Sequence, residues 1–218
     1  MHYLNTMESM IMDILSNQNI LLYLAAYILA GIPFGYLLAK QFAGVDIKSA
    51  GSGNIGATNV LRVVKETDPK LAKKLGAITL FLDAIKGVIV ILIAKMLHAP
   101  ESVLWTLAVL AVLGHCFSVF LAFEGGKGVA TGFGVLLVMM PIPALIAIAA
   151  WIIAAKGLKI SSLSSLIGLA AFIIASYVIY PEVPSIGSHA PIWIISFVIF
   201  YKHIPNIIRL FKKEEGKV

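Results

Sequence analysis

Residues 20–39 read ILLYLAAYILAGIPFGYLLA, an apolar run without a single charged side chain. About 20 such residues are what a helix needs to cross the hydrocarbon core of a bilayer. The composition of the whole chain agrees, because 60% of its 218 residues are hydrophobic and only 13% are charged. Soluble domains are about 45–50% apolar and about 25% charged. We therefore expect an all-α integral membrane protein.

Five further apolar runs follow, at residues 76–97, 103–123, 129–155, 163–180 and 192–201. The third of these is interrupted by Pro141 and Pro143, and proline inside a helix removes a hydrogen bond. We expect two short helices that turn back at these prolines. The chain then has seven transmembrane helices, some of them short or broken. In the alternative, 129–155 forms one span, a later segment is re-entrant, and five helices cross the membrane.

Positive charges distinguish the two ends of the predicted bundle. Seven Lys or Arg residues lie in segment 40–75, and five more lie in segment 202–218. Loops rich in Lys and Arg stay in the cytoplasm. We therefore expect the N-terminus outside and the C-terminus inside. The predicted organisation is an N-terminal extension (1–19), a membrane domain (20–211) and a cytoplasmic basic tail (212–218).

The net charge of +6 is also found in proteins that bind nucleic acid. Here, however, the basic residues lie between apolar segments, which fits membrane topology and anionic ligands better. No nucleic-acid partner is therefore expected. The sequence contains neither HExxH nor a Cys/His spacing typical of a metal site, so neither a metal nor another cofactor is predicted.

The predicted topology places four polar segments at the cytoplasmic face. They are GSGNIGATNVLR (51–62), EGGKGVATG (124–132), KISSLSS (159–165) and KHIPNIIRL (202–210). Polar backbone at membrane depth persists only where protein or a water-filled cavity satisfies it. Segments of this kind therefore indicate a functional site.

The first two segments have the residue types of phosphate-binding loops. Backbone N–H groups in a glycine-rich turn form an anion-binding nest, and Arg62 adds a permanently charged, planar fork. Lys127 stands between Gly126 and Gly128 at a predicted helix start, where the helix dipole attracts anions. It is not a Walker A lysine, because Gly128 and not Ser or Thr follows it. The candidate ligand contacts of the first segment are Ser52, Gly53, Asn54, Thr58 and Asn59.

The last two segments add hydroxyl, imidazole, amide and guanidinium groups. Ser162 and Ser165 are candidate ligand contacts, and the equally favoured alternative for this segment is helix capping by Ser161 or Ser162; the two roles are compatible. His203, Asn206 and Arg209 are spaced by three residues and would lie along one side of a helix. An arrangement of this kind indicates anion binding, and the alternative is an interfacial anchor with a polar rim.

Charged residues also occur inside an apolar run. Asp83 and Lys86 are three residues apart in DAIKG, and such a pair can form an ion pair along a helix. We expect a structural clamp there. For His115 we expect a hydrogen-bonded helix residue with a structural role.

Taken together, these residues resemble the bacterial acyl-phosphate:glycerol-3-phosphate acyltransferases (the PlsY family) over nearly the whole chain. The motifs that carry the resemblance are GSGNIGATNVLR, DAIKG, GHCFSVFLAFEGGKGVATG (114–132), SSLSS and HIPNIIRL. The chain departs from the family where Ile55 replaces the usual proline and Lys202 an arginine. The resemblance implies a seven-helix enzyme of the bacterial inner membrane with a cytoplasmic active site.

The implied reaction transfers a fatty acyl group from acyl phosphate to the 1-hydroxyl of sn-glycerol 3-phosphate, giving lysophosphatidic acid and phosphate. The residues expected in catalysis are Ser52, Arg62, Lys127, His203 and Asn206, while Gly53, Asn54, Thr58, Asn59, Gly126, Gly128, Ser162, Ser165 and Arg209 are expected to bind substrate. Either His203 or a substrate phosphate oxygen takes the hydroxyl proton, and we expect the latter. Membrane lipids and an acyl phosphate-forming enzyme are the expected partners.

The alternative function is a membrane transporter of an anionic phosphate ester. It predicts inverted repeats and polar residues at the bilayer midplane. The sequence shows no internal repeat.

Overall fold

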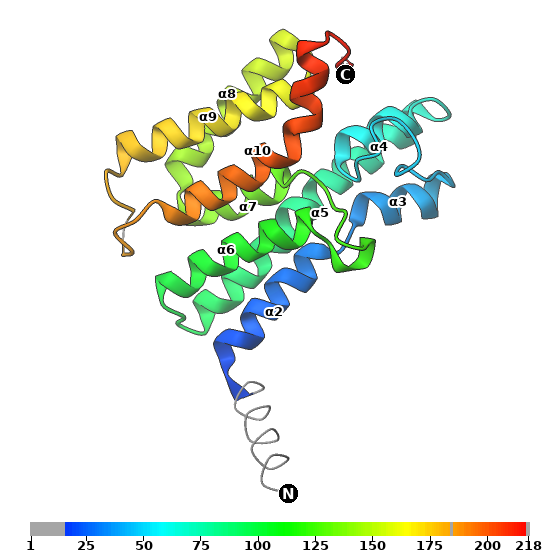
Figure 1. The fold of residues 1–218 in the computed structure, drawn as a ribbon. Helices are drawn as coiled ribbons and strands as arrows, with labels where there is room; N and C mark the ends of the chain where they lie inside the picture. The colour runs from blue at the N-terminus through cyan, green and yellow to red at the C-terminus, as the bar shows by residue number, and fades with distance from the viewer. Residues whose placement is uncertain (1–15, 184, 217–218) are drawn as a thin grey trace, which may run out of the picture.

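The computed structural model describes residues 16–183 and 185–216, and all regular secondary structure in these residues is helical (Figure 1). The elements are α2 (Gln18–Gly31), α3 (Phe34–Ala43), α4 (Ala57–Val64), α5 (Pro69–Met96), α6 (Glu101–Cys116), the 3₁₀ helix η1 (Val119–Leu121), α7 (Val129–Met139), α8 (Pro141–Leu158), α9 (Ser161–Ile179) and α10 (Ala190–Phe211). Most of the predicted N-terminal extension lies outside the described residues.

Six helical stretches in the described part of the chain are long and apolar enough to cross a membrane. They are Gln18–Ala43, Pro69–Met96, Glu101–Leu121, Pro141–Leu158, Ser161–Ile179 and Ala190–Phe211. Helix α7 is apolar but has only 11 residues. At about 1.5 Å per residue it is shorter than the bilayer's hydrocarbon core of about 30 Å. Large apolar side chains such as Phe81 and Phe197 are exposed, as lipid-facing residues would be. An all-helical, multi-span membrane protein is thereby confirmed.

The sequence predicts one continuous helix for the first apolar run, but the structure divides the run into two helices. Helix α2 ends at Gly31 and α3 begins at Phe34, so the helix breaks at Ile32 and Pro33. Proline has no N–H group, and its ring prevents the preceding residues from continuing the helix. The Ile32 carbonyl freed by the break accepts a hydrogen bond from Lys86 Nζ at 2.9 Å.

Three other boundaries differ from the predicted ones. Helix α5 begins at Pro69 rather than at residue 76, because the Asp68 side chain caps it by accepting hydrogen bonds from two backbone N–H groups. Helix α6 ends at Cys116 rather than at residue 123, and Ala122 and Phe123 adopt positive φ angles of 51° and 64°. Helix α10 continues beyond residue 201 to Phe211 and so contains the whole HIPNIIRL motif.

The predicted interruption at the two prolines is confirmed. Helix α7 ends at Met139, and α8 begins at Pro141, the first helical position, where proline is well tolerated. The two helices then have different main neighbours, because α7 packs mostly against α5 and α8 against α9. The chain therefore has two helices in this region rather than one long span.

The main hydrophobic core lies between the long helices, and a smaller one lies beneath α3, α4 and the start of α5. Helices α2 and α6 approach each other closely at Gly114, where an added Cβ would lie 2.1 Å from the Tyr27 carbonyl oxygen. This contact allows α6 to lie directly along α2 (Figure 1).

Gly114→Ala is therefore expected to force α2 and α6 apart. Overpacking of this kind costs about 1–3 kcal/mol of folding free energy. Thermal unfolding in detergent should shift to lower temperature by several degrees. Gly157→Ala in α8 is the matched control, since an added Cβ there meets nothing within 4 Å. Equal melting temperatures for the two variants would contradict this account of the packing.

Candidate active site

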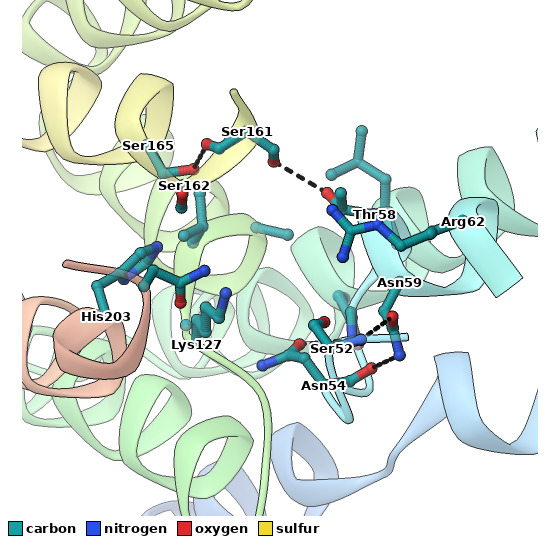
Figure 2. A pocket seen from close by; sticks show the side chains of 18 of the residues that line it. Ser52, Asn54, Thr58, Asn59, Arg62, Lys127, Ser161, Ser162, Ser165 and His203 are labelled. Atoms are coloured by element: carbon teal, nitrogen blue, oxygen red, sulfur yellow. Dashed lines mark hydrogen bonds between the residues drawn. The ribbon is translucent and has the colours of Figure 1, made fainter. Parts of the chain in front are cut away.

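A cavity of about 110 Å³ lies where the four polar segments meet (Figure 2). Its lining includes all five residues expected in catalysis: Ser52, Arg62, Lys127, His203 and Asn206. Six of the expected substrate contacts also line it: Asn54, Thr58, Asn59, Gly128, Ser162 and Ser165. The structure thus brings together residues from distant parts of the chain, while their individual roles stay predictions.

A second, more open cavity of about 400 Å³ adjoins the first. The two share Ser52, Asn54, Lys127 and Asn206. Gly53 and Arg209, also expected to bind substrate, line only the second cavity, and Gly126 lines neither. Lys127 therefore stands at the junction of two spaces, each rimmed by polar groups.

Asn59 holds the glycine-rich loop of residues 51–56 in place. Its side-chain nitrogen lies within hydrogen-bond distance of three backbone carbonyls, those of Ile47, Ala50 and Asn54, at 2.8–3.1 Å. Its side-chain oxygen accepts from Ser52 N at 2.8 Å. Asn59 is only 2% exposed, so both ends of its amide serve the loop. Its contribution to binding is therefore indirect, which sequence spacing did not reveal.

Two other features of this loop are local. Gly51 has a φ of 61°, and a Cβ there would lie 2.3 Å from the Asn59 side-chain oxygen, so glycine is required. Asn54 accepts a hydrogen bond from Gly56 N at 2.8 Å, immediately before α4 begins. These contacts give the loop a defined conformation at the start of α4.

The GGKG loop rests on the end of α6. Gly125 N and Gly126 N donate to the carbonyls of Cys116 and His115, at 3.1 and 3.0 Å. The His115 ring lies directly beneath Gly126, where an added Cβ would be 2.1 Å from Nε2. These contacts explain why the residue before Lys127 is a glycine, and they fix the position from which Lys127 reaches the cavity.

Lys127 is a half-buried cation in the lining of both cavities. Within residues 16–183 and 185–216, neither its ammonium nor the guanidinium of Arg62 has a hydrogen bond or ion pair. Burial lowers the pKa of Lys127 to about 8; Glu215 acts in the opposite direction, while Arg209 and Arg62 lower it further. Two unpaired cations facing one cavity make a site that favours a bound anion.

The serine segment connects α9 to its neighbours (Figure 2). Ser161 Oγ lies 3.0 Å from Thr58 Oγ1, which joins the start of α9 to α4. Ser165 Oγ donates to the Ser161 carbonyl at 2.9 Å and accepts from Trp151 Nε1 at 3.3 Å. Ser165 is therefore already committed to protein partners, and the Ser162 hydroxyl likewise donates to Glu215 Oε1 at 2.8 Å.

His203 has a defined tautomer when neutral. Its Nδ1 lies 2.7 Å from the Ile199 carbonyl oxygen, which only accepts hydrogen bonds, so Nδ1 carries the proton. Nε2 then keeps its lone pair. Because His203 is 1% exposed and lines the cavity, this nitrogen can act as a hydrogen-bond acceptor for a ligand hydroxyl.

Glu215 is the residue of this region that the sequence interpretation missed. Its carboxylate accepts from Ser162 Oγ at 2.8 Å, from Asn206 Nδ2 at 2.6 Å and from Arg209 Nε at 2.7 Å. Burial tends to raise the pKa of Glu215, but these hydrogen bonds outweigh it and lower the pKa below its usual value. The only signal in the sequence was an acidic pair within the basic tail.

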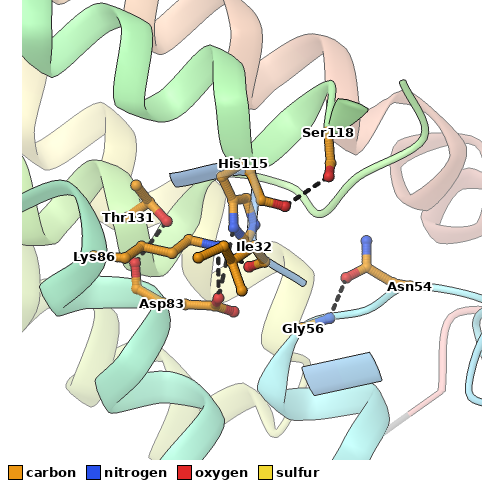
Figure 3. Close-up of polar contacts among 9 residues, drawn as sticks. Ile32, Asn54, Gly56, Asp83, Lys86, His115, Ser118 and Thr131 are labelled. Atoms are coloured by element: carbon orange, nitrogen blue, oxygen red, sulfur yellow. Dashed lines mark hydrogen bonds and ion pairs between the residues drawn. The ribbon is translucent and has the colours of Figure 1, made fainter. Parts of the chain in front are cut away.

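Beneath the cavity lies a buried polar cluster (Figure 3). Lys86 Nζ is 2.9 Å from Asp83 Oδ1, as the spacing of the two residues predicts, and Thr131 Oγ1 donates to the Asp83 carbonyl at 2.7 Å. His115 Nδ1 lies 3.7 Å from Asp83 Oδ1 and has no hydrogen-bond partner among the described residues, contrary to our expectation. Asp83 and His115 also line the cavity, so this cluster adjoins the site.

The fold and the site together define a multi-span helical membrane protein with a polar cavity whose lining includes Lys127 and Arg62. A family model described as glycerol-3-phosphate acyltransferase matches residues 20–213. The glycerol-3-phosphate acyltransferase of Wolinella succinogenes is 58% identical over 95% of this chain and 100% of its own length. That of Sulfurimonas denitrificans is 59% identical with the same coverage of both chains.

Solved structures agree with these sequences. The crystal structure of PlsY (YgiH), an integral membrane glycerol 3-phosphate acyltransferase, in its glycerol 3-phosphate form is 34% identical, with a TM-score of 0.82 over 93% of this chain and 96% of the other. The crystal structure of the lysophosphatidic acid form has a TM-score of 0.79 over 92% of this chain and 95% of its own chain. The chain belongs to the glycerol-3-phosphate acyltransferase family and is an integral membrane enzyme of phospholipid synthesis.

The charge of Lys127 should set the pH range of anion binding. With a pKa of about 8, Lys127 is charged below that pH and loses its charge above it. The affinity for glycerol 3-phosphate should therefore fall above pH 8, by about tenfold per unit where the charge is essential. Calorimetric titration in detergent would measure this change. Lys127→Arg should keep the affinity at higher pH, since arginine stays charged. If the affinity of the wild-type protein for glycerol 3-phosphate stayed constant from pH 7 to about 9.5, Lys127 would not be the group whose charge binds the anion.

Proposed function

We propose that this chain transfers a fatty acyl group from acyl phosphate to the 1-hydroxyl of sn-glycerol 3-phosphate. The hydroxyl oxygen attacks the acyl carbonyl carbon, the bond between that carbon and the phosphate oxygen breaks, and the hydroxyl loses its proton. The products are lysophosphatidic acid and inorganic phosphate. Acyl phosphate is a mixed anhydride with a good leaving group, so positioning and charge stabilisation are the main requirements.

The observation that carries this proposal is the pair of adjoining cavities with Lys127 at their junction. The smaller one is also lined by Arg62 and the larger one by Arg209. Lys202 also lines the larger one, so each space has at least one cation of its own in addition to the shared Lys127, which suits two phosphorylated reactants held side by side. The solved relatives in glycerol 3-phosphate and lysophosphatidic acid forms bind molecules of this chemistry.

The proposed topology has seven crossing segments, with α7 as a short one, the N-terminus outside and the C-terminus in the cytoplasm. The protein would lie in the bacterial inner membrane with its active site facing the cytoplasm. The clustering of Lys and Arg in segments 40–75 and 202–218 supports this orientation. Residues 20–211 would form the membrane domain and 212–218 a basic tail. Acyl phosphate would come from an enzyme that forms it nearby.

For the hydroxyl proton we propose substrate assistance. His203 Nε2, with its lone pair, accepts a hydrogen bond from the substrate hydroxyl and orients it. A phosphate oxygen of the bound substrate then takes the proton as the carbon–oxygen bond forms. A histidine base would use the same nitrogen, so the two routes differ in whether imidazole basicity matters.

The overall activity can be tested with purified protein in detergent and in liposomes. Acyl phosphate and labelled glycerol 3-phosphate should give labelled lysophosphatidic acid without coenzyme A or carrier protein. A transporter would instead move the label into the liposomes without forming product, and that result would overturn the proposal.

His203→Gln and His203→Ala separate the two proton routes. Substrate assistance predicts that Gln keeps turnover within about tenfold, because its amide oxygen still accepts a hydrogen bond, while Ala loses about 100-fold or more. Steady-state kcat is the measurement. If both variants lose turnover equally and strongly, the imidazole acts as the base and the route proposed here is wrong.

A further inference from the structure

The segment after α10 turns back over the cavity. Lys213 has a φ of 58°, and Glu214 N donates to the Arg209 carbonyl at 2.8 Å, which reverses the chain direction. Gly216 then lies close to α4, since a Cβ there would be 3.8 Å from Arg62 Nη2. Glu215 and Gly216 both line the smaller cavity. The tail therefore forms part of the cavity wall, between α10 and α4.

The Glu215 side chain points inward and is 8% exposed. It engages one donor from α9 and two from α10, namely the Ser162 hydroxyl, the Asn206 amide and the Arg209 guanidinium. A carboxylate only accepts hydrogen bonds, so it fixes which end of the Asn206 amide faces it and where the Ser162 proton points. Hydrogen bonds to a charged group are also stronger than neutral ones.

A carboxylate at this position also affects the charge balance of the cavity. The cations that face Lys127 are Arg62 from α4 and Arg209 from α10, and both oppose its protonation, whereas Glu215 favours it. The other titratable groups of the lining are His203, His115 and Asp83, and Asp83 is already paired with Lys86. Glu215 is thus the acidic group of the lining that acts directly on Lys127.

The tail carboxylate need not leave when substrate arrives. Lys127, Arg62 and the Ser52 hydroxyl have no hydrogen bond or ion pair among the described residues, and they stay available for phosphate. Glu215 uses a different set of donors. This division of the donors argues for a built-in part of the site rather than for an internal competitor.

We propose that Glu215 is a positioning residue for acyl transfer, which fixes Ser162, Asn206 and Arg209 at the wall of the cavity. This inference rests on the proposed function. It adds to that function a residue of the C-terminal tail that touches no substrate itself.

The test compares Glu215→Gln with Glu214→Gln in the full-length protein. Glu214 is the exposed neighbour in the same tail, and its side chain makes no hydrogen bond or ion pair within the described residues, so its variant should match wild type. Glu215→Gln should lower kcat/KM for glycerol 3-phosphate by about 10- to 100-fold. The activity of this variant should also begin to fall at a lower pH than that of wild type, because the Glu215 carboxylate no longer raises the pKa of Lys127.

Glu215→Asp keeps the charge but shortens the side chain by one methylene. It should lower kcat while leaving the alkaline limb of the pH profile where wild type has it. This variant decides the matter even if the Gln variant unfolds, which thermal melting in detergent would reveal. An unchanged kcat in Glu215→Asp would overturn the proposal.

Two other results would also overturn it. Glu215→Gln could behave as Glu214→Gln does at every pH, or its KM for glycerol 3-phosphate could fall with a rise in kcat/KM, as expected of an internal competitor. An inactive wild-type protein would instead refute the proposed function itself, so the two failures are distinguishable.

Discussion

The Lys86 ammonium connects the parts of this molecule that would otherwise be hardest to hold together. It lies 2.9 Å from the Asp83 carboxylate and 2.9 Å from the Ile32 carbonyl oxygen at the break between α2 and α3, an oxygen that also accepts a hydrogen bond from Phe34 N at 3.1 Å. A lone buried charge at membrane depth costs several kcal/mol, so the Lys86 ammonium needs both the Asp83 carboxylate and the Ile32 carbonyl oxygen. The break, the ion pair and the hydrogen bond from Thr131 to the Asp83 backbone therefore depend on one another. They bring α3, α5 and α7 together directly beneath the cavity.

Above this cluster the site is built from two kinds of polar group. Some are committed to the protein, such as Asn59, which holds the glycine-rich loop, and Ser165, which bonds to Ser161 and Trp151. Others, chiefly Lys127 and Arg62, face the cavity without partners among the described residues. A site for phosphorylated reactants needs both kinds of group. The free cations bind the anion, and the rigid frame holds them in position and prevents them from pairing with other protein groups.

Sequence reasoning succeeded where the signal was local and failed where it was not. The interruption at Pro141 follows from the chemistry of proline, and the pairing of Asp83 with Lys86 follows from helical spacing. The end of α6 at Cys116 was missed because the apolar run continues to residue 123, and hydropathy cannot distinguish helix from an apolar turn. Glu215 was missed because its partners on α9 and α10 are identified only by the fold.

The sequence by itself determined that this chain is a helical membrane protein and which polar segments interrupt its apolar runs. Hydropathy and proline act within a few residues, so a linear pattern carries that information. Only the tertiary structure decided that two cavities share Lys127, that Asn59 holds the glycine-rich loop at the edge of the smaller cavity, and that the tail carboxylate closes one wall. These features depend on contacts between residues far apart in the chain, whose geometry is set by how the helices pack and by the need to satisfy every buried polar group.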